Sequence, residues 1–199
     1  QGTAGFVKRG AGTLILSAAN SFSGNRQVNE GVLVGAFAGA FGTATNTATI
    51  TISPGATLVF ANNNMFGQHE SQSAPTIIVN GGTITNTGDF VCSLRNINLN
   101  SGRLDSTNGL STSYRTWALN GTITSTGASS ITDSGGDSGI ILASGTPVNT
   151  DIIVQSGTLD VSGTLHNGRT TTGNAARATS ITKLGTGTMI LSSTGHTYT

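Results

Sequence analysis

The sequence predicts an all-β protein: a stack of parallel β-coils that forms one elongated domain over residues 1–199. Three observations predict it. One strand motif occurs near both ends of the chain. Only 9% of the residues are charged, while 29 are Gly and much of the rest is Thr, Ser and Asn. Apolar residues recur in short alternating groups separated by Gly-containing corners, which indicates regular packing and argues against disorder.

The repeated motif spans residues 6–17, FVKRGAGTLILS, and residues 181–192, ITKLGTGTMILS. Gly12 and Gly187 are equivalent, and the offset between the two copies is 175 residues. The first copy continues through ANSFSG to VNEGVL, whereas the second continues as STGHTYT, with one extra residue before its aromatic residue. Such a unit cannot bury its apolar face alone and must stack on a neighbour.

This pattern resembles the autotransporter-associated β-strand repeat, which occurs in the passenger region of bacterial surface proteins. The resemblance covers residues 6–34 and 181–199, with Gln27 where the family often has Thr. It implies a right-handed parallel β-helix exported to the cell surface, and it implies no catalytic residue. Because the chain opens at Gln1 without a leader, we expect a processed form, a piece of a longer protein or a fibre subunit.

Between the two motifs, one unit recurs: two apolar residues at alternate positions, a Gly-containing corner and a further apolar residue. The units are Ile50-x-Ile52 to Leu58, Ile77-x-Val79 to Ile84, Ile97-x-Leu99 to Leu104, Trp117-x-Leu119 to Ile123 and Ile152-x-Val154 to Leu159. The corners are Pro54-Gly55, Gly81-Gly82, Ser101-Gly102, Asn120-Gly121 and Ser156-Gly157. Gly tolerates positive φ there and allows sharp bends.

Alternation predicts which side chains face inward. The expected inward ladder is Leu14, Leu16, Leu33, Leu58, Ile84, Leu104, Ile123, Leu159 and Met189. Its spacing corresponds to roughly 18 to 30 residues per coil and to about eight to ten coils. The structural alternative is an antiparallel β-sandwich, because Asn-Gly pairs at Asn80, Asn108, Asn120 and Asn167 favour hairpins.

The charge pattern argues against two classes of partner. Net charge is +1, and the nine basic residues never form a run longer than two, so nucleic-acid binding is not expected. No apolar run approaches the ~20 residues that span a bilayer, so we expect no membrane insertion by this segment. Cys92 has no partner for an internal disulfide, and its apolar neighbours predict a buried, inert thiol.

No catalytic, cofactor-binding or metal-binding residue is predicted. Gly136-Asp137-Ser138-Gly139 matches a serine-protease string, but the upstream His69 lacks the protease context, and we interpret the string as a turn. His69, His166 and His196 have no metal-ligand spacing, and no cofactor is expected. Arg103 beside Leu104 and Arg115 near Trp117 are interpreted as surface residues.

Eight acids remain as candidates for carbohydrate chemistry. They are Glu30, Glu70, Asp89, Asp105, Asp133, Asp137, Asp151 and Asp160. Asp133 and Asp137 form the closest pair, and Asp151 and Asp160 flank the strands of one unit. A polysaccharide lyase or glycoside hydrolase would need such acids to converge in one groove.

The sequence therefore favours a non-catalytic structural or adhesive segment of a secreted bacterial surface protein. It would serve as a stalk, a self-associating adhesin or a building block of an extracellular fibre, located outside the cell or on the outer-membrane surface. Self-association, lateral or end to end, is the expected interaction, and a surface glycan is a further possible partner. The alternatives are a carbohydrate-active β-helix enzyme and a passive spacer.

Overall fold

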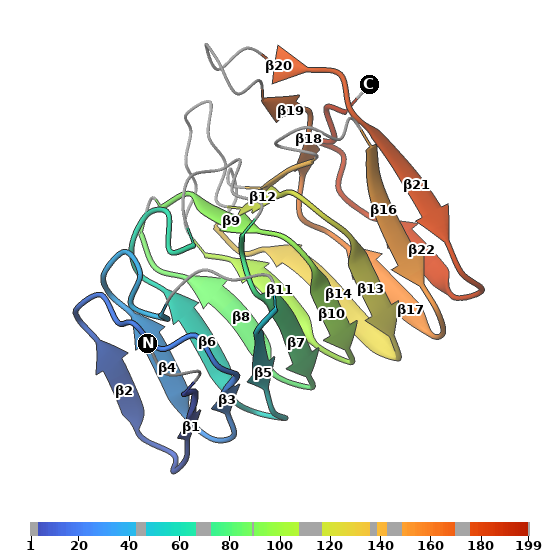
Figure 1. Ribbon diagram of the computed structural model, residues 1–199. Coiled ribbons are helices and arrows are strands. Elements are labelled where there is room, and N and C mark those ends of the chain that lie inside the picture. The colour runs from blue at the N-terminus through green and yellow to red at the C-terminus, as the bar shows by residue number, and fades with distance from the viewer. Residues whose placement is uncertain are drawn as a thin grey trace.

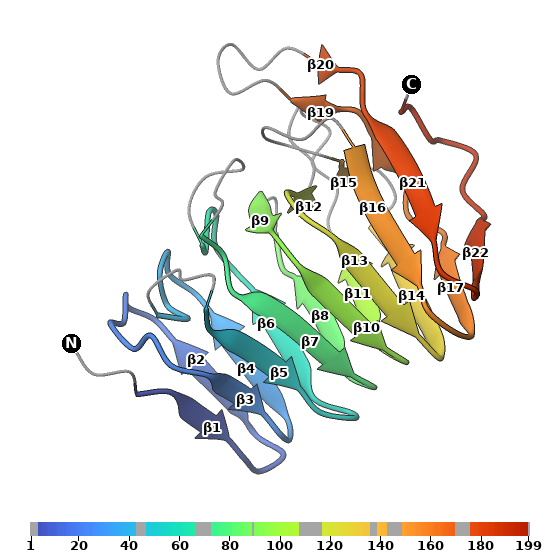
Figure 2. The same ribbon diagram turned by 45° about the vertical axis from the view of Figure 1, so that its right-hand side comes forward.

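The chain winds into a stack of coils whose strands run in the same direction along three faces (Figure 1). The computed structural model describes residues 4–42, 47–66, 73–88, 90–107, 117–135, 139–142, 149–169 and 176–198. The first coil lies at one end of the stack and the last coil at the other (Figures 1 and 2). His69, Glu70, Asp89, Asn108, Arg115, Asp137 and Ser138 lie outside the described residues.

Two faces carry eight strands each, one from every coil. Face A is built, in spatial order, from β1 (Phe6–Lys8), β3 (Arg26–Val28), β5 (Thr49–Ile52), β7 (Thr76–Asn80), β10 (Ile97–Asn100), β13 (Ile123–Thr126), β16 (Asn149–Val154) and β21 (Ser180–Leu184). Face B is built from β2 (Thr13–Leu16), β4 (Val32–Gly35), β6 (Thr57–Phe60), β8 (Thr83–Asn86), β11 (Arg103–Ser106), β14 (Ala128–Asp133), β17 (Thr158–Val161) and β22 (Thr188–Leu191).

The third face is a regular sheet only in coils four to seven. Face C consists of β9 (Cys92–Leu94), β12 (Trp117–Leu119), β15 (Ile140–Ile141) and β18 (Leu165–His166). In the first three coils, the described residues on this side form no third sheet; Asn20 Nδ2, for example, donates to Ala40 O across coils at 2.7 Å. A short hairpin of β19 (Gly168–Arg169) and β20 (Ala176–Arg177) follows β18.

Neighbouring coils pair in parallel register with 19 to 31 residues between equivalent positions, from Leu14↔Leu33 to Ile152↔Lys183. This confirms the predicted right-handed parallel β-helix at the lower end of the expected coil number. At ~4.8 Å per coil, the end strands lie roughly 35 Å apart. The antiparallel sandwich is wrong: every strand of faces A, B and C pairs in parallel, and among the described residues only β19 and β20 pair antiparallel.

One corner column turns the chain from face A to face B in every coil. A single residue with positive φ lies in each corner: Gly10, Gly31, Gly55, Gly81, Ser101, Gly127, Gly157 and Gly185. In the fifth coil, Ser101 has φ 52° and takes the place that the sequence analysis gave to Gly102. Gly102 is needed for close stacking instead, because a Cβ there would lie 2.6 Å from Val79 O.

Aliphatic ladders fill the interior between the faces. On face B, Leu33, Leu58, Ile84 and Leu104 stack in register and are buried, as predicted. Ile123 is buried but was placed on the wrong ladder: it pairs with Ile97 and Ile152 on face A, and Ile131 continues the face B ladder. The prediction placed Ile123 wrongly because Trp117–Leu119 belongs to face C. Asn120-Gly121 is therefore the corner from face C to face A.

Leu14, Leu16 and Met189 are the predicted ladder residues of the two end coils. Leu14 stacks on Leu33, whereas Leu16 pairs with Gly35, and Met189 pairs with Leu159. The three side chains are only partly buried, because each has a neighbouring coil on one side only. Leu14, for example, is 38% exposed.

Under the third side, four aromatic residues, Phe41, Phe60, Phe66 and Trp117, form one cluster. Phe60 lies 5.2 Å from Phe41, 5.8 Å from Phe66 and 5.3 Å from Trp117, measured between ring centroids. These rings replace aliphatic ladders where the backbone is irregular.

Candidate functional site

The central part of face A presents a surface without charged residues. β5, β7, β10 and β13 contain only Thr, Ile, Val, Leu, Asn and Ser. Their inward positions are buried, and their outward side chains are partly exposed. We call this surface the threonine–asparagine face; it consists of Thr49, Thr51, Thr76, Ile78, Asn80, Asn98, Asn100, Thr124 and Thr126.

Side chains on the threonine–asparagine face bond to each other from coil to coil. Asn100 Nδ2 donates to Asn80 Oδ1 at 2.7 Å, and Thr126 Oγ1 donates to Asn100 Oδ1 at 2.9 Å. These residues are direct register partners in the parallel sheet. The ladder fixes the side chains in one orientation, so the face is flat, ordered and rich in donors and acceptors.

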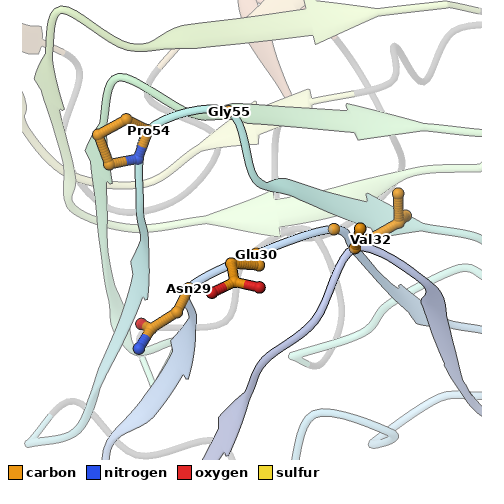
Figure 3. Close-up of a pocket in the computed structure, with 7 residues that line it drawn as sticks. Asn29, Glu30, Val32, Pro54 and Gly55 are labelled. Atoms are coloured by element: carbon orange, nitrogen blue, oxygen red, sulfur yellow. The ribbon is translucent and has the colours of Figure 1, made fainter.

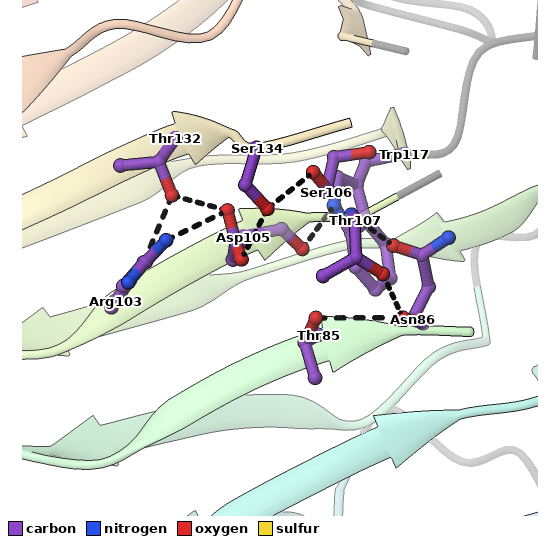
Figure 4. A network of polar contacts seen from close by, with 9 residues as sticks. All are labelled: Thr85, Asn86, Arg103, Asp105, Ser106, Thr107, Trp117, Thr132 and Ser134. Atoms are coloured by element: carbon purple, nitrogen blue, oxygen red, sulfur yellow. Dashed lines mark hydrogen bonds and ion pairs between the residues drawn. The ribbon is translucent and has the colours of Figure 1, made fainter. Parts of the chain in front are cut away.

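Face B carries a charged network around Asp105 (Figure 4). Arg103 Nη2 lies 3.1 Å from Asp105 Oδ1, and Ser134 Oγ donates to Oδ2 at 3.0 Å. Thr132 Oγ1 donates to Oδ1 and itself accepts from Arg103 Nε at 2.9 Å. Trp117 Nε1 donates to Asp105 O at 3.2 Å and ties face C to face B. Both carboxylate oxygens are thus engaged, and the network joins coils.

Asp151 and Asp160 bond to groups outside this network. Asp151 accepts from Asn149 Nδ2 at 2.6 Å on face A, while Asp160 accepts from Ser192 Oγ at 2.9 Å on face B. The pair that flanks one unit in sequence therefore points out from two different faces. Asp133 is the register partner of Ser106, and its sequence neighbour Asp137 lies outside the described residues.

Two histidines that are distant in sequence meet at the corner between the last two coils. Leu165 N donates to His196 Nδ1 at 3.1 Å, and His166 Nδ1 lies 2.9 Å from Thr197 Oγ1. Burial lowers the pKa of His196. Within the ranges that the structure describes, no group of three or more His, Cys, Asp and Glu side chains is placed to hold a metal ion.

Cys92 lies on face C with its side chain inside the stack. It is fully buried, Sγ lies 3.3 Å from Asn62 O, and burial raises the pKa of its thiol to about 12. The thiol is therefore protonated at neutral pH and is a poor nucleophile. Its predicted burial is confirmed.

An open hollow of about 460 Å³ lies at the corner column of the first three coils (Figure 3). Its lining includes Glu30, Asn29 and Pro54. The carboxylate of Glu30 accepts a hydrogen bond from Gly10 N at 2.9 Å, so it is engaged in holding coil one to coil two. The hollow offers shallow contacts from turns and no convergent polar groups.

Sequence reasoning missed the burial of Arg26. This side chain is fully buried. Its Nε donates to Phe41 O at 2.9 Å, and its Nη1 donates to Gly24 O at 2.8 Å. The guanidinium carbon lies 5.8 Å from the centroid of the Phe22 ring. Burial lowers its pKa. A signal was present: Arg26-x-Val28 takes the place of the apolar pair Ile50-x-Ile52 in the next coil.

The two end coils carry most of the exposed large hydrophobic side chains. Val7, Leu14 and Ile15 lie in β1 and β2, and Leu184, Ile190 and Leu191 lie in β21 and β22. Arg9, Lys8 and Lys183 accompany them in the same two coils. The outer edges of these strands have no neighbouring strand in the described sheets.

No described helix is long and apolar enough to cross a membrane. No curated protein and no solved structure matches the chain. The passenger-associated-transport-repeat family model matches residues 6–34 and 181–199, which are the stretches that carry the repeated motif. The first match covers two coils, and the second covers the last coil alone. The chain is thus a β-helical segment that carries this repeat of autotransporter passengers in both of its end coils.

Proposed function

We propose that the chain is a non-catalytic structural and adhesive segment of a secreted bacterial surface protein, which acts as a stalk, a self-associating adhesin or a fibre building block. It would work at the cell surface or outside the cell. The observation that carries this proposal is the threonine–asparagine face. Four neighbouring strands there contain no charged residue, and the side chains of Asn80, Asn100 and Thr126 bond to one another from coil to coil.

Such a surface suits lateral association between copies of the chain. Two faces without charge approach each other without like-charge repulsion, and ordered amides and hydroxyls lose little entropy when they form hydrogen bonds across the contact. Face B is different, because Arg103, Asp105 and Asp160 project there. We therefore expect copies to associate through face A.

The test places a charge at the centre of the threonine–asparagine face. Asn98→Lys puts an ammonium on the outward side of β10, and Thr57→Lys, on the outward side of β6 in face B, is the matched control. Purified wild type and T57K should form laterally associated fibres or rafts in electron micrographs. N98K should remain as single short rods with an unchanged melting temperature. Isolated rods of the wild type at all concentrations would contradict self-association.

A second experiment separates an adhesive role from that of a passive spacer. The segment is deleted from the surface protein in the bacterium, and cell clumping is measured together with surface display. Loss of clumping with intact display supports adhesion. Unchanged clumping with intact display would contradict the adhesive role and would support that of a passive spacer.

A further inference from the structure

Outward side chains on the central strands of face A form a regular grid, with three positions in each of coils two to six (Figure 2). β3, β5, β7, β10 and β13 lie side by side there, and their inward side chains are buried. Fourteen of the fifteen outward residues are uncharged and polar, and Ile78 is the exception. We call this surface the face A grid; it is the threonine–asparagine face together with Asn25, Gln27, Asn29, Ser53, Asn96 and Thr122.

The side chains of the face A grid are held in place by contacts with the next coil. Such contacts join Asn80, Asn100 and Thr126, as described above, and they also occur along the edge where the strands begin. Asn25 Oδ1 accepts from Thr49 N at 3.0 Å, and Asn96 Oδ1 accepts from Thr122 N at 3.3 Å. Thr side chains are in addition stiff at χ1. The grid therefore presents its donors and acceptors in fixed rows, and little rotamer entropy is lost on binding.

The face A grid has no single anchor for a ligand. Its five strands contain no aromatic residue, and Arg26, which is their one charged residue, points inward and is buried. Binding must therefore sum many weak and equivalent contacts, unlike sites that concentrate their energy in a few buried anchors. A ligand can make such contacts at every coil only if its own groups repeat at the coil spacing.

Water in ice repeats at nearly the coil spacing. In a tetrahedral network of O–H···O bonds of about 2.75 Å, second-neighbour oxygens lie about 4.5 Å apart, whereas neighbouring coils lie ~4.8 Å apart. A lattice aligned on coil four is thus out of step by only about 0.6 Å at coils two and six. Along a strand, outward positions about 6.6 Å apart meet a lattice repeat of about 7.3 Å, but only three rows have to match.

We propose that the face A grid binds ice. Each oxygen in ice both donates and accepts hydrogen bonds, as do the hydroxyls and amides of the grid, which take the places of lattice waters across coils two to six. The lack of charge favours this ligand, because an ion would keep its own hydration shell against a neutral lattice. The inference goes beyond the proposed association of copies. Both interactions use face A, so one molecule cannot make both at once through that face.

The experiment measures how the intact chain partitions between a slowly growing ice crystal and the remaining liquid. The protein is used at a concentration at which light scattering shows single chains, so association of copies does not contribute. Wild type and Thr57→Lys, whose new charge lies on face B, should accumulate in the ice. Asn98→Lys should enter the ice about tenfold less, because its ammonium would have to be desolvated.

A second variant separates the effect of charge from that of shape. Thr124→Tyr stays neutral but raises one position above the rest of the grid, so its accumulation in ice should fall to a similar degree. Thr57, Asn98 and Thr124 are all partly exposed, so each variant should keep the wild-type melting temperature.

Three results would overturn the proposal: exclusion of the wild type from ice, equal accumulation of wild type and N98K, or loss of accumulation in T57K. Retention of the wild type on insoluble cellulose together with exclusion from ice would also overturn it, and would identify a crystalline polysaccharide as the ligand. Lateral association is scored separately, in micrographs without ice. Rafts without ice binding would overturn ice binding alone, and ice binding without rafts would overturn the association of copies alone.

Discussion

The two copies of the repeat have nearly the same strand sequence but different surroundings. The first copy forms the first coil and is covered by the coil that follows it; the second copy forms the last coil and is covered by the coil before it. Lys8 is 7% exposed and donates to the carbonyl oxygens of Arg9, Gly10 and Glu30. Lys183 is exposed and donates to Gly185 O. Burial in this fold is therefore decided by the neighbouring coil.

The largest effect is expected at the corner of coil two that stacks on the corner of coil one. At Gly31, φ is 68°, and a Cβ would lie 2.5 Å from Gly12 O and 2.6 Å from both Ala11 O and Gly10 O. Gly31→Ala should lower the free energy of unfolding by about 3 to 5 kcal/mol, because backbone strain adds to a steric clash. Chemical denaturation measures this loss.

Gly55→Ala is the matched control for this corner. Gly55 has φ 74°, but a Cβ there meets nothing within 4 Å. Its substitution should cost only the strain, about 1 to 2 kcal/mol. Equal losses in the two variants would mean that close stacking of coil two on coil one is not present.

The next effect compares equivalent glycines of the two copies. A Cβ at Gly187 would lie 2.6 Å from Val154 Cγ1, whereas a Cβ at Gly12 meets nothing within 4 Å. Gly187→Ala should therefore cost about 1 to 3 kcal/mol, and Gly12→Ala less than about 0.5 kcal/mol. Thermal unfolding of the two variants measures the difference. The reverse order would contradict the placement of coil seven against the last coil.

A smaller effect is expected at the two lysines. Lys8→Gln should cost about 1 to 2 kcal/mol, because a buried ammonium with several carbonyl partners is removed. Lys183→Gln should change stability by less than about 0.5 kcal/mol. Equal losses of stability in the two variants would mean that coil two, which covers Lys8, does not strengthen the interactions of that lysine.

The smallest effect concerns acid and the end of the last coil. His196 Nδ1 accepts from Leu165 N, so the bond requires neutral imidazole. Because burial lowers the pKa of His196 in the folded state, the unfolded state binds more protons below its ordinary pKa of 6.5. The stability that this bond contributes is therefore fully present above the pKa of the unfolded state. It is lost as the pH falls through the lower pKa of His196 in the folded state.

Hydrogen exchange of the Leu165 amide measures this acid effect. Exchange, corrected for its intrinsic pH dependence, should become faster between pH 7.5 and 5 in the wild type. The same amide should be insensitive to pH in His196→Ala. Protection that persists unchanged at pH 5 in the wild type would contradict an accepting Nδ1.

Sequence reasoning predicted the stack and most of its inward ladder, because period-two alternation and Gly corners are local features. Its right-handedness was implied by the resemblance to the passenger repeat. It failed where two faces look alike in sequence. Trp117-x-Leu119 has the same pattern as Ile97-x-Leu99 but lies on face C, and only the register of neighbouring coils distinguishes them. Arg26 was missed because its guanidinium is satisfied by Phe41 O, which belongs to a distant loop.

The candidate surfaces were harder to derive than the fold. Composition showed that charged residues are few, but it did not show that charge is absent from four neighbouring strands of face A and present on face B. That separation depends on which residues stack, and hence on coil lengths that vary from 19 to 31 residues.

Disulfide trapping between β5 and β7 tests parallel stacking most directly. Thr49 and Thr76 are register partners on the outward side of face A, as are Thr51 and Ile78. Neighbouring Cα atoms about 5 Å apart allow a disulfide. Under mild oxidation, Thr49→Cys with Thr76→Cys should form an intramolecular bond, and Thr49→Cys with Asn80→Cys should not. An antiparallel pair that places Thr51 opposite Ile78 would instead trap Thr49 with Asn80, and that result would contradict the parallel coil.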